Sequence, residues 1–301
     1  IKPGDVVGFL GPNGAGKSTT MKMLTGFLTP DSGEIRIADM AMDESRQDIQ
    51  KRIGYLPEGA PAYGDMTPIQ MLDFIADIRG IKGDTKQKRI KEVVAQVELE
   101  SVLDKPIDNL SKGFKRRVGL AQAILHDPEM LILDEPTDGL DPNQKHQVRE
   151  LIRNLSKEKI VIISTHILEE VTAVCNRAMI IAAGKMLFDS TPLALQQRSR
   201  YYRAVSMQFD ELPATEHMQS ITGVKDVEVD TENKLMTLIP ASQEQNDAPS
   251  LLQNVTQFLQ QQQISAKAVF VEQGRLDDVF RELTVEPNSG SAKETTGEKA
   301  A

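Results

Sequence analysis

Apolar and polar positions in the first two thirds of the chain follow two spacings, one typical of buried strands and the other typical of helices. Apolar runs at residues 6–10, 130–133 and 160–163 have the length of strands that are buried on both faces. Between these runs, apolar residues recur at helical spacing over residues 20–28 and 143–157. Such alternation predicts an α/β fold in which helices cover both faces of a mostly parallel sheet.

A long stretch in the middle of this region has a helical pattern throughout. Its apolar side chains begin at every third position, with Ile69, Leu72, Ile75 and Ile78. The pattern continues to residue 126. We therefore expect a helical subdomain over about residues 68–127, inside a first domain that spans residues 1–198.

Beyond residue 198 the pattern is that of a smaller, separate domain. Strand patterns at 202–209, 224–229, 234–239 and 266–270 alternate with helical patterns at 214–221, 249–262 and 276–283. The order β-α-β-β-α-β predicts a ferredoxin-like α+β domain over residues 199–285. It carries no catalytic motif, so we expect a regulatory or dimer-stabilising role. After Pro287 no apolar residue is larger than Ala, and residues 286–301 are expected to be a disordered tail.

A glycine-rich loop follows the first strand and precedes the first helix. It matches the phosphate-binding pattern G-x-x-x-x-G-K-S/T at every required position. Glycines let the backbone N–H groups turn toward phosphates, Lys17 would reach the β and γ phosphates, and the Ser18 hydroxyl would ligate Mg²⁺. The predicted nucleotide site consists of Gly11, Pro12, Asn13, Gly14, Ala15, Gly16, Lys17, Ser18 and Thr19.

Two carboxylates, Asp134 and Glu135, directly follow the apolar run at 130–133. A buried strand places its last residues at the carboxyl edge of the sheet, where ligands of open α/β sheets bind. We expect Asp134 to hold the Mg²⁺ shell and Glu135 to orient or deprotonate the attacking water. Such a pair alone also fits a solvated turn, but its place after a phosphate loop favours catalysis.

These motifs resemble those of the ATP-binding subunits of ABC transporters, over roughly residues 1–190. In that family the segment L-S-G-G-Q completes the active site of the opposite subunit. The matching segment here, called the signature segment, is residues 110–114, with the sequence Leu-Ser-Lys-Gly-Phe. The resemblance implies that Ser111 and Gly113 contact the nucleotide of a second copy.

Two further positions take their roles from the same resemblance. Residues 139–141 match the D-loop, which crosses the dimer interface, so Asp141 is assigned to the nucleotide site. His166, after the strand at 160–163, matches the switch histidine that contacts the γ phosphate. A lone histidine after a strand is more often structural, and it is this ordered set of motifs that favours the catalytic role.

The sequence departs from the family pattern at three places. The signature segment has Lys112 and Phe114 where Gly and Gln are usual. Glu58, in the loop after the strand that ends at Leu56, replaces a glutamine; its carboxylate can still reach the Mg²⁺ shell, and we group it with the catalytic and metal-binding residues. The aromatic residue that stacks on adenine lies upstream of Ile1. We expect a truncated N-terminus and ATP binding weaker by ~1–3 kcal/mol.

The signature segment also begins a basic run. Its members are Lys112, Lys115, Arg116 and Arg117. A run of this kind usually marks a solvated face, and that is our expectation here.

Composition limits the partners of the protein. The net charge is −9 and the pI about 5.1, which disfavours broad binding to nucleic acid. No segment approaches the ~20 apolar residues that cross a bilayer, so direct membrane insertion is not expected. The single cysteine, Cys175, fits a reducing cytoplasm.

The resemblance therefore implies an ATPase that uses ATP and Mg²⁺ and works as a homodimer. It would power a separate transmembrane permease subunit from the cytoplasmic face of the inner membrane, as a peripheral protein. Residues 58–68, with turn residues and apolar Met66 and Ile69, are predicted to form a groove that receives a helix of that subunit. The combination of features is most similar to bacterial exporters of the drug, polysaccharide or gliding-motility kind.

Other functional classes remain as alternatives. One is a soluble ABC-type ATPase that acts on ribosomes or in DNA repair, although the chain has one phosphate loop and no long coiled-coil pattern. A Ras-type GTPase would need the motif N-K-x-D, which is absent, and P-loop kinases do not explain Ser111 together with His166. A regulatory module without turnover is disfavoured by Glu135.

Overall fold

The computed structural model describes residues 1–59, 62–242 and 250–284. The predicted tail at 286–301 and residues 60–61 of the predicted groove lie outside the described residues. The chain divides into two compact units, Ile1–Leu195 and a second unit that starts at Gln196, a few residues before the domain boundary that the sequence predicts. We describe each unit by itself.

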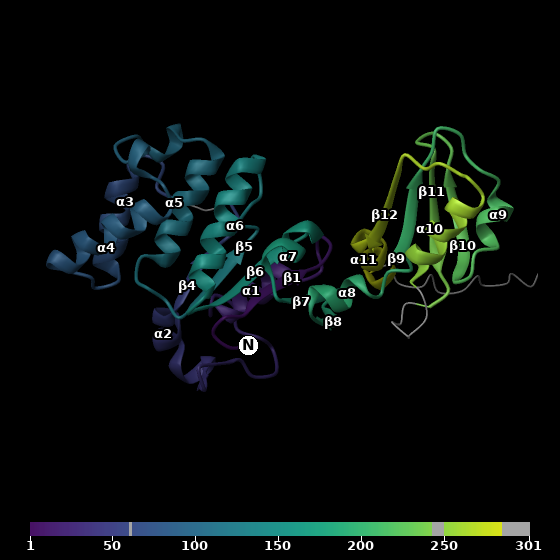
Figure 1. Cartoon of the computed structure of the whole chain (residues 1–301). Coiled ribbons are helices and arrows are strands. Elements are labelled where there is room, and N and C mark those ends of the chain that lie inside the picture. Colours follow the sequence, from purple (N-terminus) through teal and green to yellow (C-terminus); the bar gives the residue numbers. More distant parts are fainter. Residues whose placement is uncertain (60–61, 243–249, 285–301) are drawn as a thin grey trace, which may run out of the picture. The chain divides into compact units, whose positions relative to one another are not determined.

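A six-stranded sheet forms the centre of the first unit, as far as the structure describes it. Its strands are β1 (Val6–Leu10), β4 (Ile53–Leu56), β5 (Met130–Asp134), β6 (Ile160–Thr165), β7 (Arg177–Ala182) and β8 (Lys185–Ser190). They lie in the order β4-β5-β6-β1-β7-β8, and all neighbouring pairs are parallel except β7 and β8. The predicted mostly parallel α/β fold is confirmed, and the antiparallel edge strand β8 is an addition to it (Figure 1).

The residues of the central strands face one of two apolar cores, because successive side chains point to opposite sides of a sheet. Val7 and Ile132 pack with α1 (Lys17–Leu24) and α2 (Met42–Arg52). Their neighbours Val6 and Leu131 pack with the helices of the other face. Those helices are α3 (Pro68–Ile78), α4 (Gly83–Gln96), α5 (Lys112–Ile124) and α6 (Pro142–Ser156). Both faces of the central strands are therefore buried, which explains why the sequences of these strands are continuous apolar runs.

Smaller elements complete the first unit. They are the short strands β2 (Arg36–Ile37) and β3 (Met40–Ala41), the 3-10 turns η1 (Glu100–Val102) and η2 (Ile107–Asn109), and the helices α7 (Leu168–Val174) and α8 (Pro192–Gln196). Gly8 of β1 lies against α7: a Cβ atom there would be 2.8 Å from Val171. Helix α1 begins at Lys17, directly after Gly16. This start is three residues earlier than the apolar spacing indicates.

Local sequence signals fix the ends of the helices beside the sheet. Thr67 and Gln70 form a reciprocal capping box at the start of α3, and Pro68 occupies the first helical position, where a missing N–H costs nothing. Ser111 caps α5 and Asp141 caps α6, each through its side-chain oxygen. These caps place the starts of α5 and α6 where the sequence locates the signature segment and the D-loop.

The second unit contains a four-stranded antiparallel sheet with the order β10-β11-β9-β12, within its described residues. Its elements are β9 (Tyr202–Gln208), α9 (Thr215–Gln219), β10 (Val224–Asp230), β11 (Leu235–Pro240), α10 (Leu251–Gln261), β12 (Ala268–Gln273) and α11 (Leu276–Thr284). Val205, Met207 and Leu238 of the sheet share a core with Val255 of α10. This is the ferredoxin-like order that the sequence predicts, followed by one extra helix.

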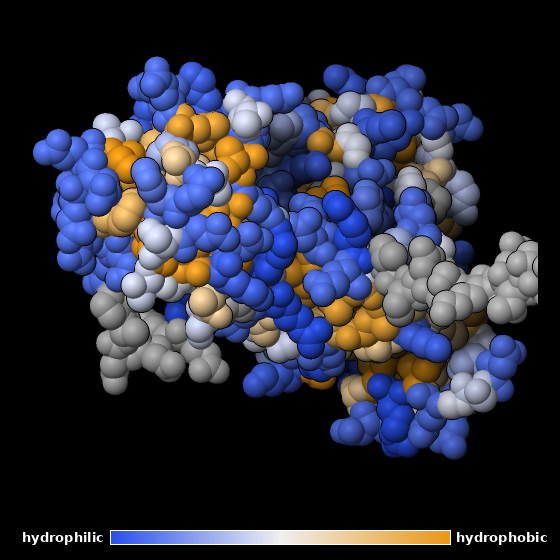
Figure 2. Space-filling model, turned by 90° about the vertical axis from the view of Figure 1, so that its right-hand side faces the viewer, coloured by the Kyte–Doolittle hydropathy of each residue, from blue (hydrophilic) through white to orange (hydrophobic). Residues whose placement is uncertain are grey.

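The surface agrees with the composition. Figure 2 shows a face that is mostly hydrophilic, with smaller hydrophobic areas between the polar side chains. Across the described ranges, no helix is both long and apolar enough to cross a membrane.

Candidate active site

Four of the predicted site segments leave the sheet at the same edge. Leu56 is paired with Leu133, Asp134 with Ser164, and Leu10 with Thr165, all in parallel register. The carboxyl ends of β4, β5, β6 and β1 therefore lie in a row. The loops that follow them carry Glu58, Glu135, His166 and the phosphate loop, in that order across the sheet.

The phosphate loop has the backbone that its glycines allow. Gly14 and Gly16 have φ angles of 80° and 103°, a left-handed region that costs energy for residues with a Cβ atom. A Cβ atom on Gly11 would lie 2.5 Å from the Ile181 carbonyl oxygen. Lys17 is 7% exposed, and its Nζ donates to the carbonyl oxygens of Gly11 and Pro12 at 2.8 and 3.3 Å. The loop thus wraps around the lysine ammonium.

The other loop residues present polar groups to the outside. The N–H of buried Ala15 donates to the Pro12 carbonyl at 3.1 Å, which closes the turn. Asn13 and Thr19 are exposed, and Ser18 is half-buried at the start of α1. The N-terminus of this helix and the positive-φ glycines form the kind of concave backbone that binds phosphate.

The carboxylates at the end of β5 have different environments. Asp134 is 1% exposed, and its Oδ1 accepts a hydrogen bond from the Ser164 hydroxyl. Glu135 has a φ angle of 49°, held by its N–H, which donates to the Ser164 carbonyl at 3.0 Å. A left-handed non-glycine residue is strained, and such strain is concentrated at functional sites. The turn aims the Glu135 side chain away from β5 toward His166.

Glu135 and His166 form a pair at the sheet edge. The His166 Nδ1 lies 3.0 Å from each Glu135 carboxylate oxygen. The Glu135 side chain is 13% exposed and that of His166 is 50% exposed. The sequence places these residues 31 positions apart, and the structure brings them into direct contact. The strand before His166, β6, is paired with β1, which precedes the phosphate loop.

The oxygen donors at this edge are of the kind that magnesium takes. Among the described residues no group of three or more His, Cys, Asp or Glu residues can hold a metal ion unaided. Mg²⁺ typically takes one or two carboxylates together with substrate phosphates, so a small donor set is what it needs. Ser18, Asp134 and the exposed Glu58 supply hydroxyl and carboxylate oxygens. Burial, with the charges of Asp134 and Glu58, raises the pKa of nearby Tyr55 to about 12.

The signature segment and the D-loop lie side by side. The Ser111 hydroxyl accepts from the Phe114 N–H at 3.4 Å, and Asp141 accepts from the Gln144 N–H at 2.9 Å. A Cβ atom on Gly113 would lie 2.5 Å from the Gln144 Oε1 atom, so a larger residue there would displace the Gln144 side chain. Ser111, Gly113 and Asp141 therefore cluster at the starts of α5 and α6.

The prediction that the basic run is a solvated face is wrong at Arg116. This side chain is 5% exposed, and its guanidinium donates to three backbone carbonyls: Asp134 at 2.6 Å, Pro136 at 3.2 Å and Pro57 at 3.4 Å. Burial lowers the pKa of Arg116, and four nearby carboxylates, Asp138 first among them, act in the opposite direction. The guanidinium thus satisfies backbone carbonyls at the end of β5 and in the loops after β4 and β5.

A second buried polar group was not predicted from the sequence. Glu170 of α7 is 4% exposed and accepts hydrogen bonds from the hydroxyls of Thr137 and Thr165. Burial raises its pKa above the ordinary value. Thr137 stands just before the D-loop and Thr165 just before His166, so one carboxylate joins the two loops from below. Glu169 and Glu170 look alike in the sequence, which gives no signal that one is buried.

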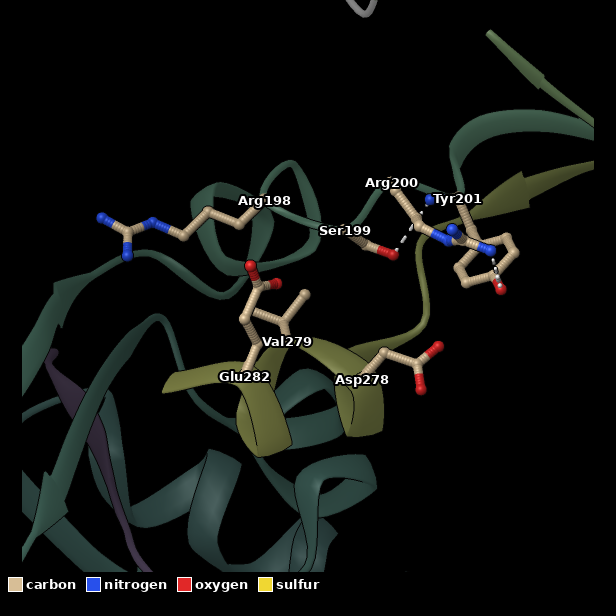
Figure 3. A pocket seen from close by; sticks show the side chains of 7 residues that line it. All are labelled: Arg198, Ser199, Arg200, Tyr201, Asp278, Val279 and Glu282. Atoms are coloured by element: carbon tan, nitrogen blue, oxygen red, sulfur yellow. Dashed lines mark hydrogen bonds between the residues drawn. The ribbon is translucent and has the colours of Figure 1, made fainter. Parts of the chain in front are cut away.

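The second unit contains a cavity of about 540 Å³ beside α11 (Figure 3). Its lining residues are Arg198, Ser199, Arg200, Tyr201, Asp278, Val279 and Glu282. The Ser199 hydroxyl accepts from the N–H groups of Tyr201 and Arg275, at 3.2 and 2.9 Å, and the Arg275 guanidinium lies 3.7 Å from the centre of the Tyr201 ring. These contacts fasten the segment before β9 to α11, and we assign them a structural role.

Comparisons with known proteins agree with this geometry. The family model for the ABC transporter matches residues 1–138. BcrA of Bacillus licheniformis, a bacitracin transport ATP-binding protein, is 39% identical over 76% of this chain and 74% of its own length. The Nod factor export ATP-binding protein I of Burkholderia pseudomallei is 35% identical over 65% of this chain and 64% of its own.

Solved structures give the same class. CbiO1 from Clostridium perfringens, part of an ABC transporter complex, has a TM-score of 0.60 and 30% identity, over 65% of this chain and 80% of that one. The chain thus belongs to the ATP-binding subunits of ABC transporters. It is a P-loop ATPase, and its reaction is the hydrolysis of ATP.

Proposed function

We propose that two copies of this chain close head to tail around ATP and drive a separate membrane-spanning subunit that exports its substrate. The clustering of Ser111, Gly113 and Asp141 carries the proposal: Gly113 packs against Gln144 of α6, the helix that Asp141 caps. One copy would then offer its row of loops to a nucleotide, and the other its signature segment. A symmetric dimer with two such sites uses every predicted residue.

The proposed catalytic roles use the residues at the sheet edge. Lys17 and the loop amides hold the phosphates, and Glu135 orients or deprotonates the attacking water with His166 as its hydrogen-bond partner. Mg²⁺, held by Ser18 and Asp134 with Glu58, would neutralise charge on the phosphates. Export is supported by the names of the relatives, which include bacitracin transport and Nod factor export.

Glu135→Gln tests the assignment of the carboxylate. It should abolish ATP turnover and stabilise an ATP-bound dimer, whereas Lys17→Ala should lose nucleotide binding itself. Glu129→Gln is the matched control, because Glu129 is an exposed residue that pairs with Arg52 at 3.4 Å. Normal turnover by Glu135→Gln would contradict the assignment.

A mixing experiment tests the trans site. Chains with Ser111→Arg and chains with Lys17→Ala are each expected to be inactive. Mixed dimers of the two should recover partial activity, since one composite site stays intact. Mixed dimers that form but do not hydrolyse ATP would count against a site shared between copies.

The predicted docking surface for the membrane subunit includes Met66. This side chain is partly buried and packs against the core of the helical region, and its carbonyl accepts from the Ile107 N–H. The apolar side chains available nearby are Tyr63 and Phe74, which are 59% and 38% exposed and meet edge to face at 5.9 Å. We propose that these two rings receive the partner.

Tyr63→Asp tests this surface. It should reduce recovery of the chain with its membrane subunit from detergent-solubilised membranes and leave basal ATPase unchanged. Leu193→Asp, at an exposed apolar residue of α8, is the control. If wild-type chain recovers no spanning partner from membranes, the alternative of a soluble ABC-type ATPase takes precedence.

A further inference from the structure

Arg116 occupies a position between the two parts of the proposed site. It lies in the second turn of α5, the helix that Ser111 caps and that presents the signature segment. Its guanidinium reaches the carbonyls of Asp134 and Pro136, on either side of Glu135, at 2.6 and 3.2 Å. The third bond, to the Pro57 carbonyl at 3.4 Å, holds the residue before Glu58.

The three bonds require an arginine. A guanidinium is planar and presents its N–H groups as a fixed fork, so one side chain can hold carbonyls that point from different strands. Lysine would bring the same charge with a single nitrogen, and a neutral side chain would bring no charge. Because Arg116 is buried, the loss of its donors would leave carbonyls without partners at the ends of β4 and β5.

The charge of the guanidinium matters as well as its bonds. Asp134, Glu135, Asp138 and Glu58 all lie close enough to raise the pKa of Arg116 by their charge. These are the carboxylates of the proposed metal and water site and its flanking loop. Arg116 is therefore a buried cation among anions that would otherwise repel one another.

We propose that Arg116 is a positioning residue that connects the signature helix to the catalytic strand end and holds the turn that carries Glu135. The inference rests on the proposed function of Glu135 and Ser111. It predicts that loss of Arg116 impairs both hydrolysis and ATP-driven dimerisation, while the phosphate loop continues to bind nucleotide.

Arg117 provides a matched control on the same helix. Its side chain is 11% exposed, and it bonds to the Glu98 carboxylate at 2.8 Å, the Val97 carbonyl at 3.1 Å and the Gln147 side chain of α6, and lies over the Phe114 ring at 5.7 Å. Both arginines are thus largely buried and hydrogen-bonded. Only one of them contacts the catalytic strand, so the pair separates a role in the site from a role in stability.

The experiment compares Arg116→Met, Arg116→Lys and Arg117→Met in the full chain. We expect Arg116→Met to lower kcat about 10- to 100-fold, the loss expected for buried charged hydrogen bonds, and to leave the KM for ATP within about threefold. Arg116→Lys should recover part of the loss because it keeps the charge. Arg117→Met should melt earlier but keep kcat within about threefold.

A second measurement does not depend on turnover. Each arginine variant is combined with Glu135→Gln, and ATP-dependent dimerisation is followed by light scattering, with binding of a fluorescent ATP analogue as the check on the phosphate loop. The Arg116→Met combination should bind the analogue and remain a monomer at ATP concentrations that dimerise Glu135→Gln alone. The Arg117→Met combination should dimerise.

The outcomes separate this inference from the proposed function. If Glu135→Gln alone hydrolyses ATP normally, the proposed site fails. If Glu135→Gln is inactive but Arg116→Met matches Arg117→Met in kcat and in dimerisation, only the positioning role of Arg116 is overturned. Should Arg116→Met not fold, Arg116→Lys decides: a kcat within threefold of wild type overturns the role.

Discussion

Glu170→Ala is the sharpest test of how the loops at the sheet edge are held. Glu170 is 4% exposed. It accepts hydrogen bonds from the hydroxyls of Thr137 and Thr165, and these residues are 3% and 0% exposed. The Thr165 bond is 2.8 Å long, and the Thr165 hydroxyl also accepts from the Ile167 N–H at 3.0 Å. Alanine would remove the only acceptor that the structure gives these two hydroxyl protons among the described residues.

The magnitude follows from these contacts. Each buried hydroxyl left without its acceptor costs about 1–3 kcal/mol. Alanine also removes a carboxylate whose burial is unfavourable, which offsets part of this cost. We therefore expect the free energy of unfolding to fall by about 2–4 kcal/mol. For a cassette of this size each kcal/mol lowers Tm by about 2–4 °C, which predicts a fall of about 4–16 °C. Because His166 follows Thr165 directly, kcat should fall about tenfold as well.

Thermal unfolding and steady-state ATPase measure the two effects. Glu169→Ala is the control: Glu169 is the neighbour on α7, its side chain is 76% exposed, and its pair with Arg149 at 3.3 Å is worth little. Glu170→Gln keeps the shape and one acceptor and should lose less than half as much. If Glu170→Ala and Glu169→Ala melt within about 1 °C of each other, the reasoning on buried hydroxyls is refuted.

Glu170 also gives a pH dependence with a definite sign. Burial raises its pKa above the ordinary 4.5, so the folded state holds the proton more tightly than the unfolded state. Its contribution to stability is complete below pH 4.5 and is lost as the pH rises through the folded pKa. Glu170→Gln should therefore gain stability relative to wild type as the pH rises from 4.5 toward neutrality.

Three further predictions concern other parts of the molecule. Burial lowers the pKa of His126 from 6.5 to about 4, so its stabilising effect is present above pH 6.5 and lost as the pH falls through 4. Between pH 7 and pH 5 the wild type should lose about 2 kcal/mol of its free energy of unfolding in urea, and His126→Gln should not. Equal losses in the two proteins would contradict this. Tyr201→Ala should destabilise the second unit by about 3 kcal/mol and Tyr201→Phe by about 1 kcal/mol. Alanine removes both the ring, which contacts the Arg275 guanidinium, and the hydroxyl, which donates to Glu228 at 2.8 Å, whereas phenylalanine removes only the hydroxyl. Equal unfolding midpoints of the two variants would refute the role of the ring. Removal of the chain after Leu195 should leave ATP hydrolysis within a few-fold and weaken dimer or partner association, and complete loss of ATPase in a folded, nucleotide-binding fragment would show that the second unit contributes to the site.

The fold could be predicted from the sequence where one physical signal dominated. The strands β1, β5 and β6 are buried on both faces, so they read as unbroken apolar runs, and their predicted positions agree with the structure to within two residues. Strand β8 gave no such signal, since Lys185, Met186 and Leu187 are exposed at the edge of the sheet. Edge strands depend on pairing with a neighbour, which a local pattern does not contain.

The site was predictable to the extent that its chemistry is local in the sequence. The glycines and Lys17 form a continuous motif, and the motif can be read without a structure. The contact between Glu135 and His166 depends on the parallel pairing of β5 with β6, which periodicity only suggests. Arg116 did carry a signal that the charge run concealed: it is spaced by three from buried Gly113 and by four from buried Leu120, on the inward face of α5.

The buried polar groups explain how a generic sheet edge becomes a catalytic one. Parallel strands end in carbonyls and loops that have no partners of their own, and water would satisfy them equally well in many arrangements. Arg116 fixes the loops after β4 and β5, and Glu170 fixes those after β5 and β6, each through buried hydrogen bonds. Both bind the β5 loop, so the turn that carries Glu135 is held from two sides. We therefore expect the double variant Arg116→Met with Glu170→Ala to lose less activity than the product of the single losses, because the second change acts on a turn that the first has already released.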